Sequence, residues 1–323
     1  MNILFLIQSF IPKEKYQEYM GVLQGTITSI RRQQCNQDFK IHITLSDDGS
    51  EYLENLAESQ IKIISGNYLK HVRNIHSLDI DSLVLVGKSN HYNKGELFNY
   101  YLRQEGNNYD LIIFLDDDNP FVYTHSLKKF IFHFKNGYNF ILGRLSSAQG
   151  TLRSFYDNKV QGTTFALTYN ALKDIDFFGD RIKLWGCGED SDIFWRIYSG
   201  YKNGIIKAVY DGTIITIDRI SGRWKYCREK TGGIEFFKKD FYETYGIDPH
   251  RNPSRKKTEW ITLEKNFRNI DESLFPFIYL DEYMACKKRF LYYKIIWNLR
   301  KLRHKISCVK CKIKGLSPLF EHV

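Results

Sequence analysis

Short apolar runs that alternate with helix-patterned segments constrain the fold of this chain more than any other feature. The runs predict buried strands, and the segments between them carry apolar residues at helical spacing. In chain order, the predicted elements are a strand over Ile3–Ile7, a helix over Tyr16–Arg32, a strand over Phe39–Leu45, a helix over Tyr52–Ser59, a strand over Ile61–Ser65, a helix over Lys94–Gln104 and a strand over Leu111–Leu115. Strands separated by helices indicate an α/β fold, with a mostly parallel sheet and helices on both of its faces.

Two of the predicted strands end in clusters of carboxylates. The stretch "SDDGS" contains Asp47 and Asp48, and the stretch "LDDDNPF" contains Asp116, Asp117 and Asp118. Taken singly, each cluster is typical of an Asx-rich turn that closes a strand. Because ligands of parallel sheets bind outside the carboxyl ends of the strands, the two clusters together favour a binding site.

A third acidic group opens a helix in the second half of the chain. In "WGCGEDSDIFWRI", Glu189 and Asp190 fall in the first turn, and Ile193, Phe194 and Ile197 give the helix a buried face. Carboxylates in a first turn are ordinary partners of the helix dipole, so a structural role is the alternative to a chemical one.

These stretches resemble the GT-A glycosyltransferases, in particular family 2 and the bacterial chondroitin-type polymerase domains. The resemblance lies in five stretches in the same order: "SDDGS" at 46–50, "NKGELFN" at 93–99, "LDDDNPF" at 115–121, "WGCGEDSDIFWRI" at 185–197 and "DGTIITID" at 211–218. It covers about the first 250 residues. It implies a Rossmann-like GT-A domain over residues 1–265, followed by a helical, basic extension over residues 266–323.

The resemblance implies that Asp116 and Asp118 are a DxD pair that binds Mn²⁺ or Mg²⁺. The departing diphosphate of a nucleotide sugar needs a divalent cation, and hard cations take carboxylate oxygens. Asp118 would contact the metal, and Asp116 would bind the ribose or a metal-bound water. Alternation along the chain would place Asp117 on the opposite side, and we count it among the nucleotide-binding residues.

The same resemblance assigns the other donor-side residues. Asp47 and Asp48 would bind the base and the ribose, and Lys94 would help to hold the nucleotide; its alternative is a solvated lysine at a helix start. Asp218 stands where related chains usually carry a metal-binding histidine, and an aspartate also serves a hard metal. The first strand ends in "IQSF" where related chains usually have Thr-Tyr-Asn.

On the acceptor side, the resemblance makes Asp190 the general base, with Glu189 beside it to orient or bind the acceptor. A sugar hydroxyl is a poor nucleophile until a base removes its proton, which a carboxylate in a pocket can do. Trp185 would offer a flat face to an acceptor sugar, unless it is a core aromatic, and Gly188 would also lie at the acceptor. A base opposite the leaving group implies inversion at the anomeric carbon.

The predicted function is therefore a metal-dependent inverting glycosyltransferase of the hexosyltransferase type. It would move a sugar from a nucleotide-sugar donor, UDP-linked, to a glycan or glycolipid acceptor in bacterial surface polysaccharide, lipopolysaccharide or capsule synthesis. The processive-synthase pattern Gln-x-x-Arg-Trp is only echoed by "ISGRW" at 220–224, which favours single additions. The alternatives are a metal-dependent phosphohydrolase or nuclease, which would normally add histidines near the metal, and a catalytically silent sugar- or lipid-binding module.

The net charge of +10 is concentrated near the C-terminus. Between Ala285 and Gly315 the chain has eleven Lys and Arg residues and no Asp or Glu, interleaved with apolar residues. This pattern is typical of a helix on an anionic membrane surface, or of a packed helix with a basic solvated face. Because the body is close to neutral, a nucleic-acid partner is not expected.

Localisation follows from three further observations. No apolar run is long enough to span a bilayer, and the N-terminal run lacks a cleavage site, so we expect a cytoplasmic protein peripheral to the inner face of the cytoplasmic membrane. The six cysteines have no disulfide-framework spacing, which suits a reducing compartment. Cys308 and Cys311 are the close pair, and a metal or redox role for them is an alternative.

Overall fold

The computed structural model describes residues 1–33, 38–50, 53, 61–72, 75, 77–85, 94–147, 162–179, 188–220, 233–249, 251–255, 260–263, 299 and 302. Most of the predicted helix Tyr52–Ser59, Trp185, most of "ISGRW" and the C-terminal extension with Cys308 and Cys311, apart from Leu299 and Leu302, lie outside the described residues. Among the helices that are described, none combines the length and the apolar character needed to cross a bilayer.

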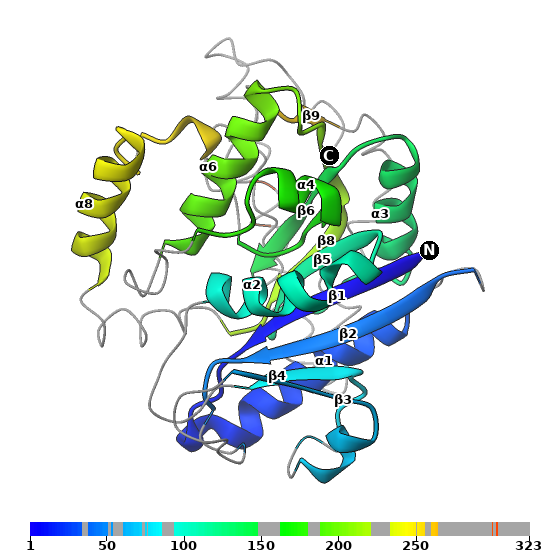
Figure 1. Ribbon diagram of the computed structural model, residues 1–323. Helices are drawn as coiled ribbons and strands as arrows, with labels where there is room; N and C mark the ends of the chain where they lie inside the picture. The colour runs from blue at the N-terminus through cyan, green and yellow to red at the C-terminus, as the bar shows by residue number, and fades with distance from the viewer. Residues whose placement is uncertain are drawn as a thin grey trace.

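The described residues contain nine strands, all in one sheet (Figure 1). The strands are β1 Asn2–Ser9, β2 Lys40–Asp47, β3 Lys62–Ser65, β4 Ser82–Leu85, β5 Leu111–Asp116, β6 Phe140–Ser147, β7 Phe165–Thr168, β8 Ala208–Asp218 and β9 Thr262–Leu263. The α-helices are α1 Tyr16–Arg31, α2 Lys94–Glu105, α3 Ser126–Lys135, α4 Tyr169–Asp174, α6 Glu189–Lys202 and α8 Gly233–Tyr245. Short 3-10 helices are η1 Lys13–Lys15, η2 Gly66–His71, η3 Gly106–Asn108 and η4 Pro253–Arg255.

The strand order is β3-β4-β2-β1-β5-β7-β6-β8-β9. Pairing is parallel between β1 and its neighbours β2 and β5, between β2 and β4, and between β8 and its neighbours β6 and β9. β3 is antiparallel to β4, and β7 is antiparallel to both β5 and β6. The predicted strands and helices that fall on described residues are confirmed to within one or two residues at most ends, and the mostly parallel sheet is confirmed.

Helices cover both faces of the sheet, as predicted, because the central strands are apolar on both sides. Along β1, Leu4 and Leu6 belong to one core cluster, whereas Ile3, Phe5 and Ile7 belong to the other. The first cluster takes side chains from α2, α4, α6 and α8, and the second takes side chains from α1 and α3. This alternation is the period-2 geometry of a strand buried between two helical layers.

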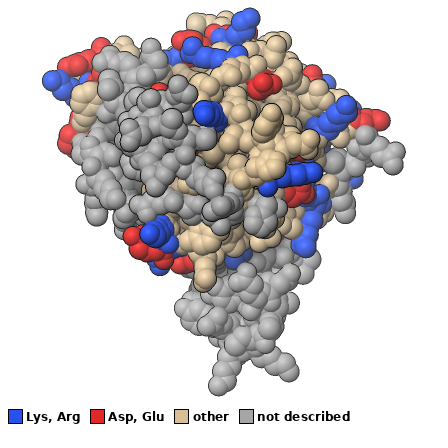
Figure 2. Space-filling view, turned by 60° about the horizontal axis from the view of Figure 1, so that its bottom comes forward, with Lys and Arg blue, Asp and Glu red and all other residues tan. Residues whose placement is uncertain are grey.

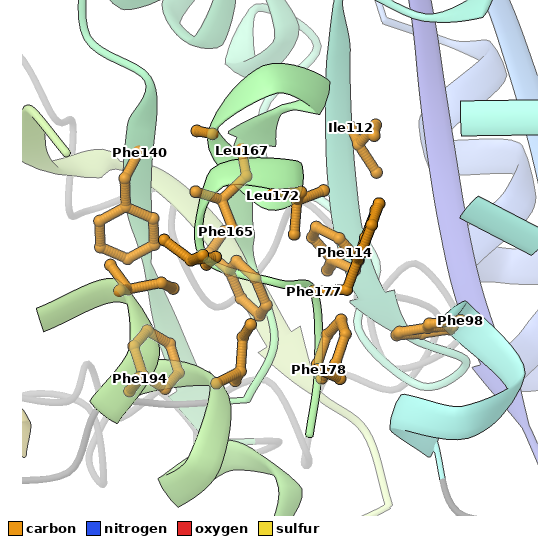
Figure 3. Packing of buried hydrophobic residues seen from close by; sticks show 14 of the residues in the cluster. Phe98, Ile112, Phe114, Phe140, Phe165, Leu167, Leu172, Phe177, Phe178 and Phe194 are labelled. Carbon is orange, nitrogen blue, oxygen red and sulfur yellow. The ribbon is translucent and has the colours of Figure 1, made fainter. Parts of the chain in front are cut away.

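An aromatic core fixes the helices that carry polar residues toward the carboxyl edge of the sheet (Figure 3). Phe114 of β5 stacks on Phe165 of β7 with ring centroids 4.7 Å apart, and it contacts Phe98 of α2 at 5.5 Å. Phe194 of α6 packs edge-on against Phe165 at 5.4 Å and against Phe140 of β6 at 5.9 Å. Through these rings, α2 and α6 are held on the same face of the sheet and at fixed positions.

The charged side chains of the described residues are mixed on the face that Figure 2 shows. Lys and Arg side chains lie there beside Asp and Glu side chains and do not form a patch of one sign (Figure 2). The basic residues that could form such a patch are in the C-terminal extension, most of which is not described.

Candidate active site

The two aspartate clusters meet at one edge of the sheet because β1 lies between β2 and β5. Ser9 of β1 is in register with Asp47, and Gln8 is in register with Asp116. The backbone carbonyl of Ser9 accepts a hydrogen bond from the Asp48 amide at 2.9 Å, and that of Gln8 accepts one from the Asp117 amide at 3.1 Å. The structure therefore brings the two clusters to the same edge of the sheet, on strands that β1 separates.

Asp47 holds the turn that follows β2. Its side chain is fully buried, and its two oxygens accept hydrogen bonds from the amide and the hydroxyl of Ser50, each at 2.7 Å. Ser50 Oγ in turn accepts a bond from the Ile11 amide at 2.8 Å. Burial raises the pKa of Asp47 to about 7, although the bonds from Ser50 oppose this shift. Asp48 is half-buried at the same edge, so it is the more accessible of the two predicted nucleotide contacts.

The third cluster residue, Asp118, lies against the end of β8. Its backbone carbonyl accepts a bond from the Arg219 amide at 3.0 Å, and its carboxylate accepts bonds from the Ile220 amide at 3.2 Å and the Asn119 side chain at 3.1 Å. These contacts bring Asp118 close in space to Asp218, the last residue of β8. Two of the three predicted metal ligands therefore lie on adjoining segments.

The expected alternation of the three aspartates assumed strand geometry that does not continue past Asp116. β5 ends at Asp116, and the bond from the Asn119 amide to the Asp116 carbonyl at 3.2 Å closes a turn, so strand geometry does not continue to Asp117 and Asp118. Both of these residues are nearly buried, at 2% and 6% exposure. The Asp117 carbonyl is bound by the hydroxyl of Thr26 on α1 at 2.8 Å, which fixes this turn to the helical layer.

Lys94, the first residue of α2, is buried and not solvated. Only 4% of its side chain is exposed, so the alternative of a solvated helix-start lysine is wrong. Its Nζ donates to Asp116 Oδ1 at 2.6 Å and to the Gly162 carbonyl at 2.7 Å. Burial alone would lower the pKa of Lys94, but Asp116, Asp190 and Glu189 together outweigh burial and raise it to about 12. Lys94 is therefore a fixed positive charge.

Asp190, in the first turn of α6, also lies at Gly162, the residue that Lys94 contacts. A β-carbon on Gly162 would overlap the carboxyl group of Asp190, so this carboxylate lies directly on the Gly162 backbone. The carbonyl of that glycine accepts the bond from Lys94, and Asp190 and Glu189 both act on the charge of Lys94. The predicted base, its neighbour, Lys94 and Asp116 are thus gathered into one cluster.

Gly188, predicted to lie at the acceptor, is the N-cap of α6. Its φ of 91° is in the left-handed region that favours glycine, and a β-carbon there would lie 2.5 Å from the Phe237 ring of α8. Glycine is therefore required both by the backbone turn and by the close packing of α8.

Sequence reasoning missed Gly162 and Thr163, which precede β7. Besides the Gly162 contacts, the Thr163 hydroxyl accepts a bond from the Asp116 amide at 3.0 Å, so this segment buttresses the end of β5. The signal that could have found it is weak: a glycine followed by Thr163 and Thr164, just before the apolar run Phe165–Leu167.

The described residues give a partial test of the predicted metal site. Within the described ranges, no three His, Cys, Asp or Glu side chains come together in a group that could hold a metal ion. Magnesium is commonly bound by one or two carboxylates, with substrate phosphates and water completing the shell. Asp116, with a third of its side chain exposed, and Asp118 beside the end of β8 meet this smaller requirement.

The sequence matches no protein-family model and no curated protein. Solved structures to which the fold is similar include TarS from S. aureus, at 14% identity and a TM-score of 0.42, where the match covers 69% of this chain and 59% of that one. TarS structures also exist with UDP and with UDP-GlcNAc. This chain therefore spans less than two thirds of the TarS chain.

Two further similar structures contain manganese. The mannosyltransferase PcManGT from Pyrobaculum calidifontis, in complex with GDP-Man and Mn²⁺, is 11% identical with a TM-score of 0.46, over 93% of this chain and 84% of that one. A mutant of Drosophila β1,4-galactosyltransferase 7, with manganese, UDP-Gal and xylobiose, is 14% identical with a TM-score of 0.40. The match covers 70% of this chain and 74% of that one. Because all of these TM-scores are below 0.5, the function proposed below rests on the side chains of this chain.

Proposed function

We propose that this chain is a metal-dependent inverting glycosyltransferase that moves a hexose from a UDP-linked sugar to a glycan or glycolipid acceptor. The observation that carries the proposal is the meeting of two carboxylates from distant elements around one buried cation. Asp116 is bonded to Lys94, and Asp190 lies against Gly162, which accepts the other bond of the same lysine. Acids suited to the donor and to the acceptor therefore share one cluster.

Asp190 would act as the general base in this reaction. A carboxylate within hydrogen-bond reach of the acceptor hydroxyl can take its proton as the oxygen attacks the anomeric carbon. Glu189 precedes it in the same helical turn and would bind or orient the acceptor. With the base opposite the departing nucleotide, a single in-line displacement inverts the anomeric centre.

The donor would lie at the ends of β2 and β5. Asp116 and Asp118 would hold the divalent cation, with substrate phosphates and water as its other ligands, because Asp218 forms no three-carboxylate group with them among the described residues. When bound, Mn²⁺ or Mg²⁺ supplies positive charge to the departing diphosphate. Asp48 would contact the nucleoside, while Asp47 keeps the turn in place through Ser50.

The biological setting is proposed from the sequence. A bacterial surface polysaccharide, lipopolysaccharide or capsule glycan would be the acceptor, and the protein would lie at the inner face of the cytoplasmic membrane. The eleven cations between Ala285 and Gly315, unaccompanied by acidic residues, support attraction to anionic lipid.

The test begins with a screen of nucleotide sugars for Mn²⁺-dependent thermal stabilisation, since a ligand that binds the folded state raises its apparent stability. Products of the stabilising donor then separate the alternatives. Transfer to an added acceptor supports the proposal, whereas release of sugar by water alone would indicate a hydrolase. Binding without any turnover would indicate a silent binding module.

The assignment of the base is tested by Asp190→Asn, which keeps the shape of the side chain but cannot accept a proton. Transfer should fall by roughly a hundredfold to ten-thousandfold. The dissociation constant of the donor should be nearly unchanged, because the donor contacts are on other elements. Asp174→Asn, on the exposed side of α4, is the matched control. Loss of donor binding in Asp190→Asn would instead make Asp190 a donor-site residue.

A further inference from the structure

Asp192, two residues after the proposed base Asp190, links three separate segments of the chain. Its side chain is 1% exposed and accepts hydrogen bonds from the Gly179 amide at 2.7 Å, from Arg196 Nε at 3.0 Å and from the Tyr245 hydroxyl at 2.5 Å. Gly179 lies after α4, Arg196 is one turn further along α6, and Tyr245 is the last residue of α8. A single buried carboxylate thus joins α6, α8 and the segment after α4.

The bonds around Asp192 continue into the neighbouring segment. Arg196 Nη1 donates to the carbonyl of Asp176 at 3.2 Å, so its guanidinium spans from the Asp192 carboxylate to the backbone after α4. Removing one partner of such a buried charge pair strongly destabilises the folded state, because the other charge is left buried and unpaired. The geometry of the three segments is therefore strongly specified at this point.

A second contact holds the start of α6 against α8. Phe237 of α8 packs on the Cα of Gly188, the residue that begins α6. Phe237 and Tyr245 lie eight positions apart on α8, and they contact Gly188 and Asp192, which lie four positions apart around the first turn of α6. Figure 1 shows the two helices side by side. We call these two contacts the α6–α8 clasp.

The first turn of α6 needs such support. Gly188 has no side chain with which to cap the helix, so the turn rests on bonds from the amides of Ser191 and Asp192 to the Gly188 carbonyl, at 2.9 and 3.1 Å. Helix residues two positions apart do not face each other, so Asp192 points toward α8 when Asp190 points toward Gly162.

We propose that Asp192 and Tyr245 are positioning residues for the transfer reaction, and that the α6–α8 clasp fixes the direction in which Asp190 meets the acceptor. This inference rests on the proposed function. Asp192 does not reach the reacting atoms, and it acts through the helical turn that it shares with Asp190. The element α8, which contains none of the predicted motifs, thereby helps to position the proposed base.

The test compares Tyr245→Phe with Tyr242→Phe. The first change removes the hydrogen bond to Asp192 and keeps the ring, which packs on Phe241 at 4.7 Å and on Trp195 at 5.9 Å. The second makes the same chemical change on the same helix, at a side chain that is 58% exposed. Asp192→Asn is a second variant that weakens the clasp from the α6 side.

Tyr245→Phe and Asp192→Asn should lower kcat by roughly tenfold or more, because a misplacement of about 1 Å can cost a hundredfold. The dissociation constant of the donor should stay within about twofold, as expected for an effect confined to the transition state. Tyr242→Phe should change neither. A lower melting temperature with an unchanged kcat in Tyr245→Phe would overturn the inference and leave the clasp a stability feature.

Hydrogen exchange separates failure of this inference from failure of the proposed function. If the wild-type protein transfers no sugar, the proposed function fails, and the clasp is judged by exchange of the amides of Ser191 and Asp192. Faster exchange in Tyr245→Phe than in Tyr242→Phe supports the clasp as the element that orders this turn. Equal exchange in the two variants overturns it.

Discussion

Gly162→Ala is the substitution that tests the proposed site most directly. The added methyl group would overlap Cγ, Oδ1 and Oδ2 of Asp190, whereas real β-carbons keep at least 3.0 Å from such atoms. The carboxylate must therefore move by about 1 Å or more, a displacement that can cost roughly a hundredfold in rate when the group is catalytic. The folded state should lose about 1–3 kcal/mol, the usual cost of overpacking.

The assay for Gly162→Ala measures kcat, the dissociation constant of the donor and the melting temperature. We expect kcat to fall by roughly a hundredfold. Donor binding should change little, because the Gly162 carbonyl that holds Lys94 is kept and the carboxylates assigned to the donor lie at the ends of β2, β5 and β8, away from the added methyl group. Gly25→Ala is the matched control, since nothing lies within 4 Å of a β-carbon there and α1 should gain up to about 1 kcal/mol. A wild-type kcat in Gly162→Ala would refute the placement of Asp190 as the base.

Three further predictions concern the donor side. Lys94→Met should weaken donor binding and destabilise the fold by up to about 3 kcal/mol, because Asp116 loses its buried partner; unchanged urea unfolding would contradict this. Asp118→Ala should keep the fold but lose the Mn²⁺-dependent part of the thermal shift given by the donor, and a wild-type Mn²⁺ affinity would argue against a ligand role. Asp47→Asn should flatten the dependence of stability on pH. The pKa of Asp47 rises from 3.8 to about 7 on folding, so the folded state binds more protons between these values and wild-type stability falls as pH rises from about 4 to 7, by at most about 1.4 kcal/mol per pH unit. Urea unfolding of both proteins at several pH values checks this, and parallel curves would contradict it.

The parts of the fold that could be predicted are those that a local pattern of apolar and turn residues specifies. β1, β2 and β5 are apolar runs closed by turn residues, and α1 and α2 have apolar faces at helical spacing, so their positions follow from neighbours in sequence. β4 and β7 were not predicted, although β3, which also has four residues, was. The antiparallel direction of β7 is set by its partners β5 and β6, not by its own residues.

The candidate site shows the same division between local and tertiary information. The acidic clusters could be assigned to one edge because parallel strands share a direction. The burial of Lys94, by contrast, depends on Asp116 and Gly162, which are distant in sequence, and a lysine at a helix start is ordinarily solvated. Asp47 likewise becomes a buried turn residue because Ser50 and Ile11 enclose it, which the string "SDDGS" alone does not reveal.

The end of β1 has a consequence for how this protein can vary. Gln8 and Ser9 secure both acidic loops through their backbone carbonyls, so replacing either side chain leaves those two bonds in place. As far as these two hydrogen bonds are concerned, substitutions in "IQSF" would therefore keep both acidic loops at the same edge of the sheet. Proline at position 48 or 117 would be different, because it removes the amide that makes the bond. Side-chain changes at the end of β1 therefore leave the two backbone hydrogen bonds intact, whereas positions 48 and 117 must at least keep a backbone N–H.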